Sequence, residues 1–157
     1  MATRHWLMKS EPTTFGIDHL AKAKGRTTRW DGIRNYQARN LLRDEVQKGD
    51  LVLFWHSSAD PAGAAGTCEV VRAAYPDPTQ FDPSSDGHDP GSKRDDPRWL
   101  CVDVRLVAKF PRVVSVDEIR ARKDLAKMDV LRRGNRLSAQ RVTPEEFAAV
   151  VAMAGGK

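Results

Sequence analysis

The sequence of 157 residues contains few cysteines and no long apolar run. Cys68 and Cys101 each lie in an apolar stretch, without the Cys-x-x-Cys or Cys/His spacing of a metal site. This favours small buried hydrophobic side chains in a reducing compartment and argues against structural zinc. No apolar run approaches the roughly 20 residues of a membrane span, and residues 1–5 begin no signal-peptide pattern. We therefore expect a cytoplasmic protein with no membrane association and no bound metal.

Phosphate-cradling motifs are also missing, since neither GxGxxG nor a P-loop occurs, and we expect no cofactor. The charge balance does carry information. Lys and Arg number 26 against 21 Asp and Glu, a formal charge of +5. Arginines crowd two stretches, 26–43 and 132–141, while many acids lie between them. A basic chain with clustered arginines moderately favours an anionic partner such as nucleic acid.

Hydrophobic patterning predicts short strands interrupted by small helices. Polar–apolar alternation and apolar runs indicate strands at 5–10, 51–57, 67–74, 98–110 and within 131–142. Capping residues and 3.6-residue stripes indicate helices over 14–23, 35–49, 115–122 and 143–155. These elements predict one α+β domain over residues 1–157, a compact β-barrel with helices packed outside. An alternating βαβα sheet fits them less well.

The segment 76–97 is rich in proline and aspartate. Five prolines exclude a regular element, and the segment is long for a connection, so it is either functional or mobile. Its aspartates do not have the spacing of a calcium-binding loop. We expect a solvated acidic loop.

Four segments combine polar and aromatic residues beyond what a core requires: 9–12, 30–40, 54–57 and 97–99. All four tryptophans lie in or next to these segments. A single tryptophan is usually a large core residue. Four of them beside loops rich in His, Asn, Arg and Ser favour the wall of a pocket.

The motifs WLMKSEP, WDGIRNYQARN, LVLFWHSS, DPRW and RLSAQRVT resemble the EVE domain, within the PUA-like superfamily. The resemblance covers nearly the whole chain. It implies a PUA-like β-barrel of about five to six mostly antiparallel strands, similar to the YTH domains that read methylated adenine in RNA. It also implies a reader of modified cytosine in DNA. The sequence departs from the family at Ala139 and Arg141, where the LSVQPV pattern has Val and Pro, and in an acidic loop that lacks tyrosines.

The resemblance and the residue chemistry together predict a pocket for a flipped base. Trp30 matches the cage tryptophan of the YTH relatives, and an indole face suits base stacking. The Glu11 carboxylate can accept a hydrogen bond from the exocyclic amine of cytosine, although a surface or capping role fits it equally. The predicted pocket residues are Lys9, Ser10, Glu11, Trp30, Asp31, Gly32, Ile33, Asn35, Tyr36, Trp55, His56 and Ser57.

Phosphate contacts are predicted around the start of the helix that Asn35 caps, because free N–H groups at a helix start attract anions. Basic and amide side chains flank this point or lie in the other aromatic and basic segments. The predicted contacts are Arg34, Gln37, Arg39, Arg98 and Arg136.

Two other functions remain open. Some ASCH relatives hydrolyse modified cytidines, but a hydrolase needs a nucleophile and a base within hydrogen-bond reach. Lys9 and Ser10 are adjacent on a strand and point to opposite faces, while Ser10 with Glu11 or His56 is conceivable. A general PUA-type RNA-binding module is the third function. We expect a monomeric binding protein, not an enzyme, whose partner is nucleic acid carrying a modified base, DNA or RNA.

Overall fold

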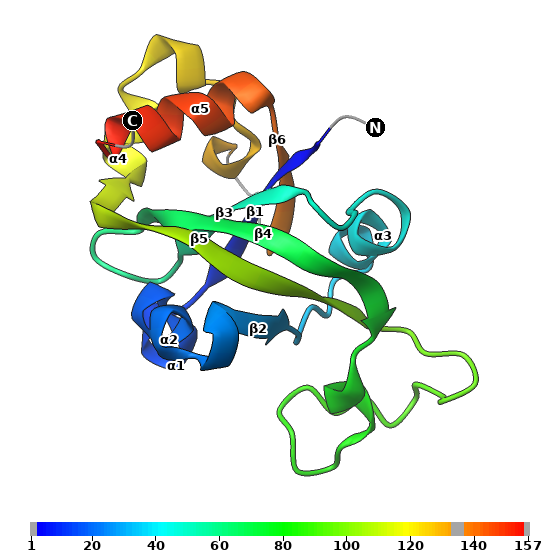
Figure 1. Ribbon diagram of the computed structural model, residues 1–157. Coiled ribbons are helices and arrows are strands. Elements are labelled where there is room, and N and C mark those ends of the chain that lie inside the picture. Colours follow the sequence, from blue (N-terminus) through cyan, green and yellow to red (C-terminus); the bar gives the residue numbers. More distant parts are fainter. Residues whose placement is uncertain (1–2, 133–136, 156–157) are drawn as a thin grey trace.

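A single twisted sheet of six strands organises the computed structural model, which describes residues 3–132 and 137–155 (Figure 1). The strands lie in the order β2-β5-β4-β3-β1-β6. Only β1 and β3 are parallel, and the other neighbours are antiparallel. The strands are β1 (His5–Ser10), β2 (Thr27–Trp30), β3 (Leu51–His56), β4 (Gly63–Pro76), β5 (Leu100–Ser115) and β6 (Ala139–Val142).

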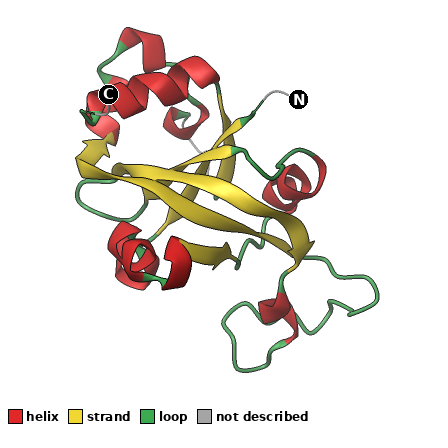
Figure 2. Ribbon diagram, in the orientation of Figure 1, coloured by secondary structure: helices red, strands yellow, loops and turns green. Residues whose placement is uncertain are grey.

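Short helices cover both faces of this sheet (Figure 2). The buried side chains of α2 and α3 belong to one hydrophobic core, and those of α4 and α5 belong to another; Figure 1 shows α1 beside α2, and α4 beside α5. The α-helices are α1 (Pro12–Phe15), α2 (Ile17–Lys22), α3 (Tyr36–Asp44), α4 (Val116–Arg120) and α5 (Pro144–Met153). Short 3-10 helices are η1 (Lys24–Arg26), η2 (Pro78–Phe81), η3 (Lys123–Leu125) and η4 (Asp129–Leu131).

The alternation of side chains along the central strands creates two hydrophobic cores. In β1, Trp6 and Met8 face the core beneath α2 and α3, while Leu7 faces the core beneath α4 and α5. In β3, Phe54 faces the first core and Trp55 the second. The face on which a side chain lies decides which residues at the strand ends can contact one another. This alternation therefore positions the candidate site.

The α+β class and the mostly antiparallel sheet are confirmed, but the prediction of a barrel was wrong. Strands β2 and β6 end the sheet, and within residues 3–132 and 137–155 they do not pair with each other. Both have only four residues, so each forms one short ladder. A hollow, lined by residues of both strands, separates the carboxyl end of β1 from β2.

Several predicted boundaries need correction. The helix expected over 14–23 is two helices separated by Gly16, whose backbone is extended. Strand β2 was missed, and α3 ends at Asp44, before the predicted limit at 49. The capping boxes at Ser115 and Thr143 are confirmed, since each hydroxyl accepts a hydrogen bond from the backbone three residues on. The predicted strand within 131–142 is only β6.

Candidate nucleic-acid interface

A pocket of about 330 Å³ lies where β1 ends, between α1 and β2. Its lining mixes an indole, a phenyl ring, hydroxyl groups and charged side chains. The lining residues are Lys9, Ser10, Thr14, Phe15, Thr28, Arg29, Trp30 and Asp31. Four of the predicted pocket residues, namely Lys9, Ser10, Trp30 and Asp31, therefore meet at one hollow.

Trp30 is both a core residue and a wall of this pocket. Its side chain is 7% exposed and belongs to the first core. Its ring meets Phe54 edge to face at 5.1 Å between centroids. Such a contact fixes an aromatic plane and adds to the energy of burial. Packing in the core therefore fixes the orientation of the indole that borders the pocket.

Ser10 and His56 face the same side of the sheet as Phe54, and both join β1 or β3 to the α1–α2 segment. The Ser10 hydroxyl donates to the Phe15 carbonyl at 2.7 Å, and Ile17 N–H donates to His56 Nε2 at 3.1 Å. Burial lowers the pKa of His56, while the charge of Asp18 opposes this shift. The first bond holds the backbone of Phe15, which lines the pocket, and the second holds the start of α2.

The charged groups of the pocket are Lys9, Arg29 and Asp31. Arg29 Nε donates to Asp31 Oδ2 at 2.8 Å. Burial lowers the pKa of the half-buried Lys9. Glu11 is exposed and is not among the lining residues, and its carbonyl accepts from Thr14 and Phe15 at the start of α1. The carboxylate at the pocket is therefore that of Asp31.

The structure does not bring Trp55 to the pocket. Its side chain is 3% exposed and packs in the second core, on the opposite face of the sheet from Phe54. The signal was present in the sequence, because residues 54 and 55 of one strand must point to opposite faces. Ser57 lies just beyond β3, where its N–H donates to the Ser10 carbonyl at 2.9 Å.

Gly32 and Ile33 connect the pocket to α3 without lining the hollow. Gly32 has a φ of +80°, which favours glycine. Its N–H donates to Asp77 Oδ2 at 2.8 Å, and the Ile33 side chain is buried in the first core. Their role in this structure is to fix the chain between Trp30 and Asn35.

Asn35 caps α3, as expected, because its side chain accepts from Ala38 N–H at 3.0 Å. Tyr36 and Gln37 begin the helix and are exposed. Tyr36 does not line the pocket, so the structure places this aromatic residue on a separate surface.

Arg34, a predicted phosphate contact, is engaged inside the protein. Each of its five N–H groups donates to an acceptor within the protein. The acceptors are the carbonyls of Ile33 and Gly87, the Thr79 hydroxyl and the Asp77 carboxylate. A guanidinium has five donors, so all of them are used. A phosphate could bind Arg34 only by displacing one of these acceptors.

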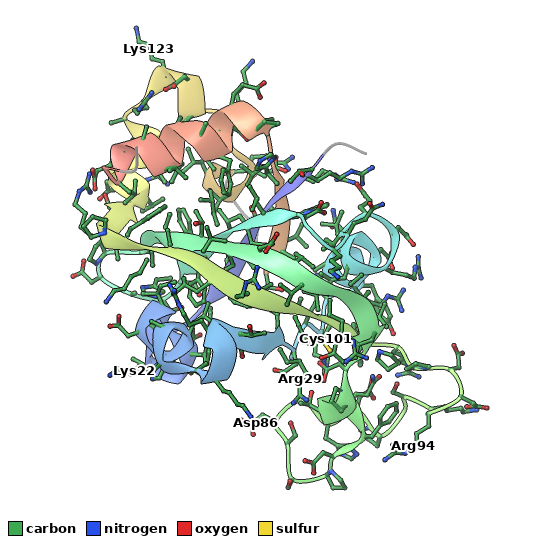
Figure 3. All side chains as sticks on the ribbon, viewed as in Figure 1. Lys22, Arg29, Asp86, Arg94, Cys101 and Lys123 are labelled. Carbon is green, nitrogen blue, oxygen red and sulfur yellow. The ribbon has the colours of Figure 1, made fainter. Side chains whose placement is uncertain are left out.

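The segment after β4 is folded rather than merely solvated, and it forms a projecting lobe (Figure 2). We call residues 77–99 the acidic lobe. Figure 3 shows Asp86 and Arg94 on different parts of it. Its centre is the fully buried Gln80, whose amide donates to the carbonyls of Asp77 and Trp99 and accepts from Ser92 and the Trp99 N–H.

Asp77 joins the acidic lobe to the segment that follows β2. Its carboxylate is fully buried and accepts from Gly32, Arg34 and Thr79. Burial raises the pKa of Asp77, but the hydrogen bonds from Thr79, Gly32 and Arg34 outweigh it and hold the pKa below its usual range. Asp77 was not among the predicted site residues, because nothing in the sequence distinguishes it from the other aspartates of the lobe.

The remaining predicted phosphate contacts are Gln37, Arg39, Arg98 and Arg136. Gln37 and Arg39 lie on α3, and Arg39 Nη1 donates to the Arg98 carbonyl at 3.0 Å. Arg98 is exposed and pairs with Asp89 at 3.4 Å. Arg136 lies outside the described residues.

Two further observations apply to residues 3–132 and 137–155. No helix there combines the length and the apolar character that crossing a bilayer requires. No group of three or more His, Cys, Asp or Glu side chains in the same ranges is arranged to hold a metal ion.

The fold and the pocket together define a small α+β module with an aromatic-walled hollow beside the open end of its sheet. The EVE domain model matches residues 4–153, and the chain belongs to the EVE family. Thymocyte nuclear protein 1 of Homo sapiens is 39% identical over 95% of this chain and 73% of the human protein.

Solved structures agree with this assignment. A Pseudomonas putida protein has a TM-score of 0.90 and 45% identity over 96% of this chain and 99% of its own. Human THYN1 protein in complex with 5-methylcytosine-containing DNA has a TM-score of 0.91 and 38% identity over 99% of both chains. An ASCH protein of Zymomonas mobilis has a TM-score of 0.52 at 9% identity, a likeness of fold alone.

Proposed function

We propose that this protein binds nucleic acid that carries a modified cytosine of the 5-methyl type, most simply DNA, with the base flipped into the Trp30 pocket. The observation that carries the proposal is the meeting of Trp30, Ser10, Lys9 and Asp31 at one hollow of about 330 Å³. The similar human THYN1 protein, solved with 5-methylcytosine-containing DNA, supports the choice of ligand. The cytoplasmic location and the monomeric state stay predictions.

The chemistry of the pocket suits a cytosine base. The Trp30 indole borders the hollow, and stacking of a base on an aromatic ring contributes about 1–3 kcal/mol. Cytosine presents an exocyclic amine that donates to carboxylates. Because Asp31 lines the pocket and Glu11 does not, we assign the amine contact to Asp31 in place of Glu11. Lys9 supplies the donor for a ring or carbonyl acceptor of the base.

Binding is favoured over hydrolysis by the partners of the candidate catalytic groups. The Ser10 hydroxyl donates its proton to the Phe15 carbonyl, and His56 Nε2 already accepts from Ile17. A serine nucleophile would need its proton to point at a base. We therefore propose a reader without hydrolytic chemistry. Incubation of 5-methyl-2′-deoxycytidine with the protein, followed by mass spectrometry, checks this, since any product would contradict it.

A titration of matched oligonucleotides tests the reader function. Two DNA strands of one sequence are compared, with cytosine or 5-methylcytosine at a single central position, as single strands and as duplexes. We expect tighter binding of the methylated member, with affinity falling as salt rises by a log–log slope of about −0.9 per phosphate contacted on duplex DNA. Equal affinity for the two members would reject a reader of the methyl group. The same pair made as RNA tests the general RNA-binding alternative.

A further inference from the structure

A second aromatic surface lies at the start of α3, apart from the Trp30 pocket. Tyr36, the first residue of α3, is 53% exposed. Its ring lies 4.8 Å from the ring of Trp99 with 32° between their planes, and Trp99 is 6% exposed. The Arg39 guanidinium lies 4.9 Å from the centroid of the Tyr36 ring. We call Tyr36, Arg39 and Trp99 the Tyr36 platform.

Hydrogen bonds within the acidic lobe fix Trp99, the buried residue of the platform. Trp99 Nε1 donates to Asp89 at 2.8 Å, and the Trp99 backbone bonds to the buried Gln80 through both its N–H and its carbonyl. The Arg34 guanidinium lies over the same indole, 5.5 Å from the ring centroid. The exposed tyrosine therefore rests on an ordered base. An aromatic group fixed in this way loses little rotamer freedom when a ligand covers it.

The composition of the platform indicates the kind of partner. Two adjacent aromatic rings, tilted by 32° and each with a guanidinium group over it, offer the groups that attract nucleobases, because every base has a π-face and arginine adds cation–π attraction. Among the described residues, the other large apolar side chain of comparable exposure is Val107, which is aliphatic and belongs to β5. An aliphatic side chain offers neither a π-face for stacking nor a partner for a cation–π contact.

The platform lies within reach of a strand bound at the Trp30 pocket. Tyr36 lies six positions after Trp30 in the chain, so their Cα atoms are at most about 21 Å apart, the span of a fully extended chain. Successive nucleotides of a DNA strand rise about 3.4 Å. The two sites are therefore a small number of nucleotides apart.

We propose that the Tyr36 platform stacks on an unpaired base of the same strand, a few nucleotides from the base held in the Trp30 pocket. This inference rests on the proposed function. It gives the acidic lobe a role, because the lobe holds Trp99 beneath Tyr36. A protein partner or a second copy of the chain at this surface is an alternative that the experiment must separate.

The first test compares an oligonucleotide with a free nucleoside. Tyr36→Ala is expected to weaken binding of a single-stranded oligonucleotide with one central 5-methylcytosine by roughly 5- to 150-fold, the range for one stacked base. It should leave binding of 5-methyl-2′-deoxycytidine unchanged. Tyr36→Phe keeps the ring and should stay within about twofold of wild type by the same reasoning. Val107→Ala, at an exposed position on another element, serves as the matched control and should change neither affinity.

The second test locates the stacked base. An abasic site is placed in turn at each of the six nucleotides on either side of the methylated position. One position should weaken binding by wild type as much as Tyr36→Ala does, and Tyr36→Ala should lose nothing more on that oligonucleotide, because the same contact is removed twice. Uniform affinities along the scan would overturn the platform.

The outcomes separate the two proposals. A clear preference for methylated DNA without any effect of Tyr36→Ala rejects the platform and keeps the reader function. No methyl preference with a strong and position-specific Tyr36 effect rejects the reader function instead. A change in sedimentation behaviour of Tyr36→Ala with unaltered oligonucleotide affinity would assign the surface to contact between copies of the chain.

Discussion

Asp77 Oδ2 lies 3.0 Å from Arg34 Nη1 in an ion pair whose carboxylate is fully buried and whose guanidinium is one quarter exposed. The two residues are 43 positions apart in the chain. The pair joins the acidic lobe to the segment between Trp30 and α3. The pair therefore helps to position both aromatic surfaces, because that segment connects Trp30 in the pocket to Tyr36 in the platform.

Asp77→Asn is expected to lower the free energy of unfolding by about 3 kcal/mol, because the Arg34 charge loses its buried counter-ion. Urea denaturation measures the change. Asp86→Asn also removes one negative charge from the lobe, but at an exposed position. Its free energy of unfolding should stay within about 0.5 kcal/mol of wild type. Equal effects of the two substitutions would show that general charge, and not the buried pair, determines the stability of the lobe.

Trp30 and Trp55 offer a matched pair on opposite faces of the sheet. Each is buried, so Trp30→Phe and Trp55→Phe should both lower the free energy of unfolding by about 1–3 kcal/mol. Only Trp30→Phe should weaken binding of methylated DNA, by roughly fivefold, the lower end of the stacking range. Calorimetry and titration on the same samples check both statements. Loss of binding in both variants, or in neither, would mean that the indole of Trp30 is not a ligand wall.

Alternation predicted β1 and residues 100–110 of β5, because a half-buried strand imposes a two-residue period on its side chains, and the apolar run at 51–57 predicted all of β3. The same rule would have placed Trp55 on the face of the sheet opposite to Phe54 and His56, and His56 itself does not line the pocket. The open sheet, in contrast, depends on how the four-residue β2 pairs with β5, which is a non-local property. The role of Asp77 could not be predicted for a related reason, because its partners Gly32 and Arg34 lie more than 40 residues away in the sequence.

The pocket residues were partly predictable for a physical reason. Lys9, Ser10 and Trp30 stand at strand ends, where side chains meet the space between elements. Tyr36 lies only six residues beyond Trp30, yet the turn through Gly32 and the cap at Asn35 carry it to another surface. The prediction grouped Tyr36 with Trp30 because they are close in the sequence, and it therefore treated two separate surfaces as one site.

Asp31 and Glu11 provide the next comparison. Asp31→Asn removes the charged acceptor for the exocyclic amine and should weaken binding of methylated DNA by an amount within the 1–3 kcal/mol of a good base-edge contact. Glu11→Gln removes a carboxylate that is exposed outside the pocket and should leave the affinity unchanged. Fluorescence anisotropy with a labelled oligonucleotide distinguishes them. The reverse order of effects would return the base-reading role to Glu11.

His56 gives the folded protein a defined response to acid. Its Nε2 accepts from Ile17 N–H, so the neutral ring makes the bond that holds the start of α2. Burial lowers the pKa of His56 below its ordinary value near 6.5, with Asp18 opposing the shift. As the pH falls, the unfolded chain therefore binds a proton before the folded one does. The stabilising contribution is complete above about pH 6.5 and is lost as the pH falls through the lower, folded-state pKa.

His56→Gln should flatten this response, because glutamine can still accept from Ile17 but does not titrate. Urea unfolding between pH 7.5 and 5 measures the slope of stability against pH, to which one group contributes at most about 1.4 kcal/mol per pH unit. His88→Gln, at an exposed histidine of the acidic lobe, should keep the wild-type slope. If His56→Gln kept that slope as well, the acid response would belong to other groups, and the link between β3 and α2 would have to tolerate a protonated ring.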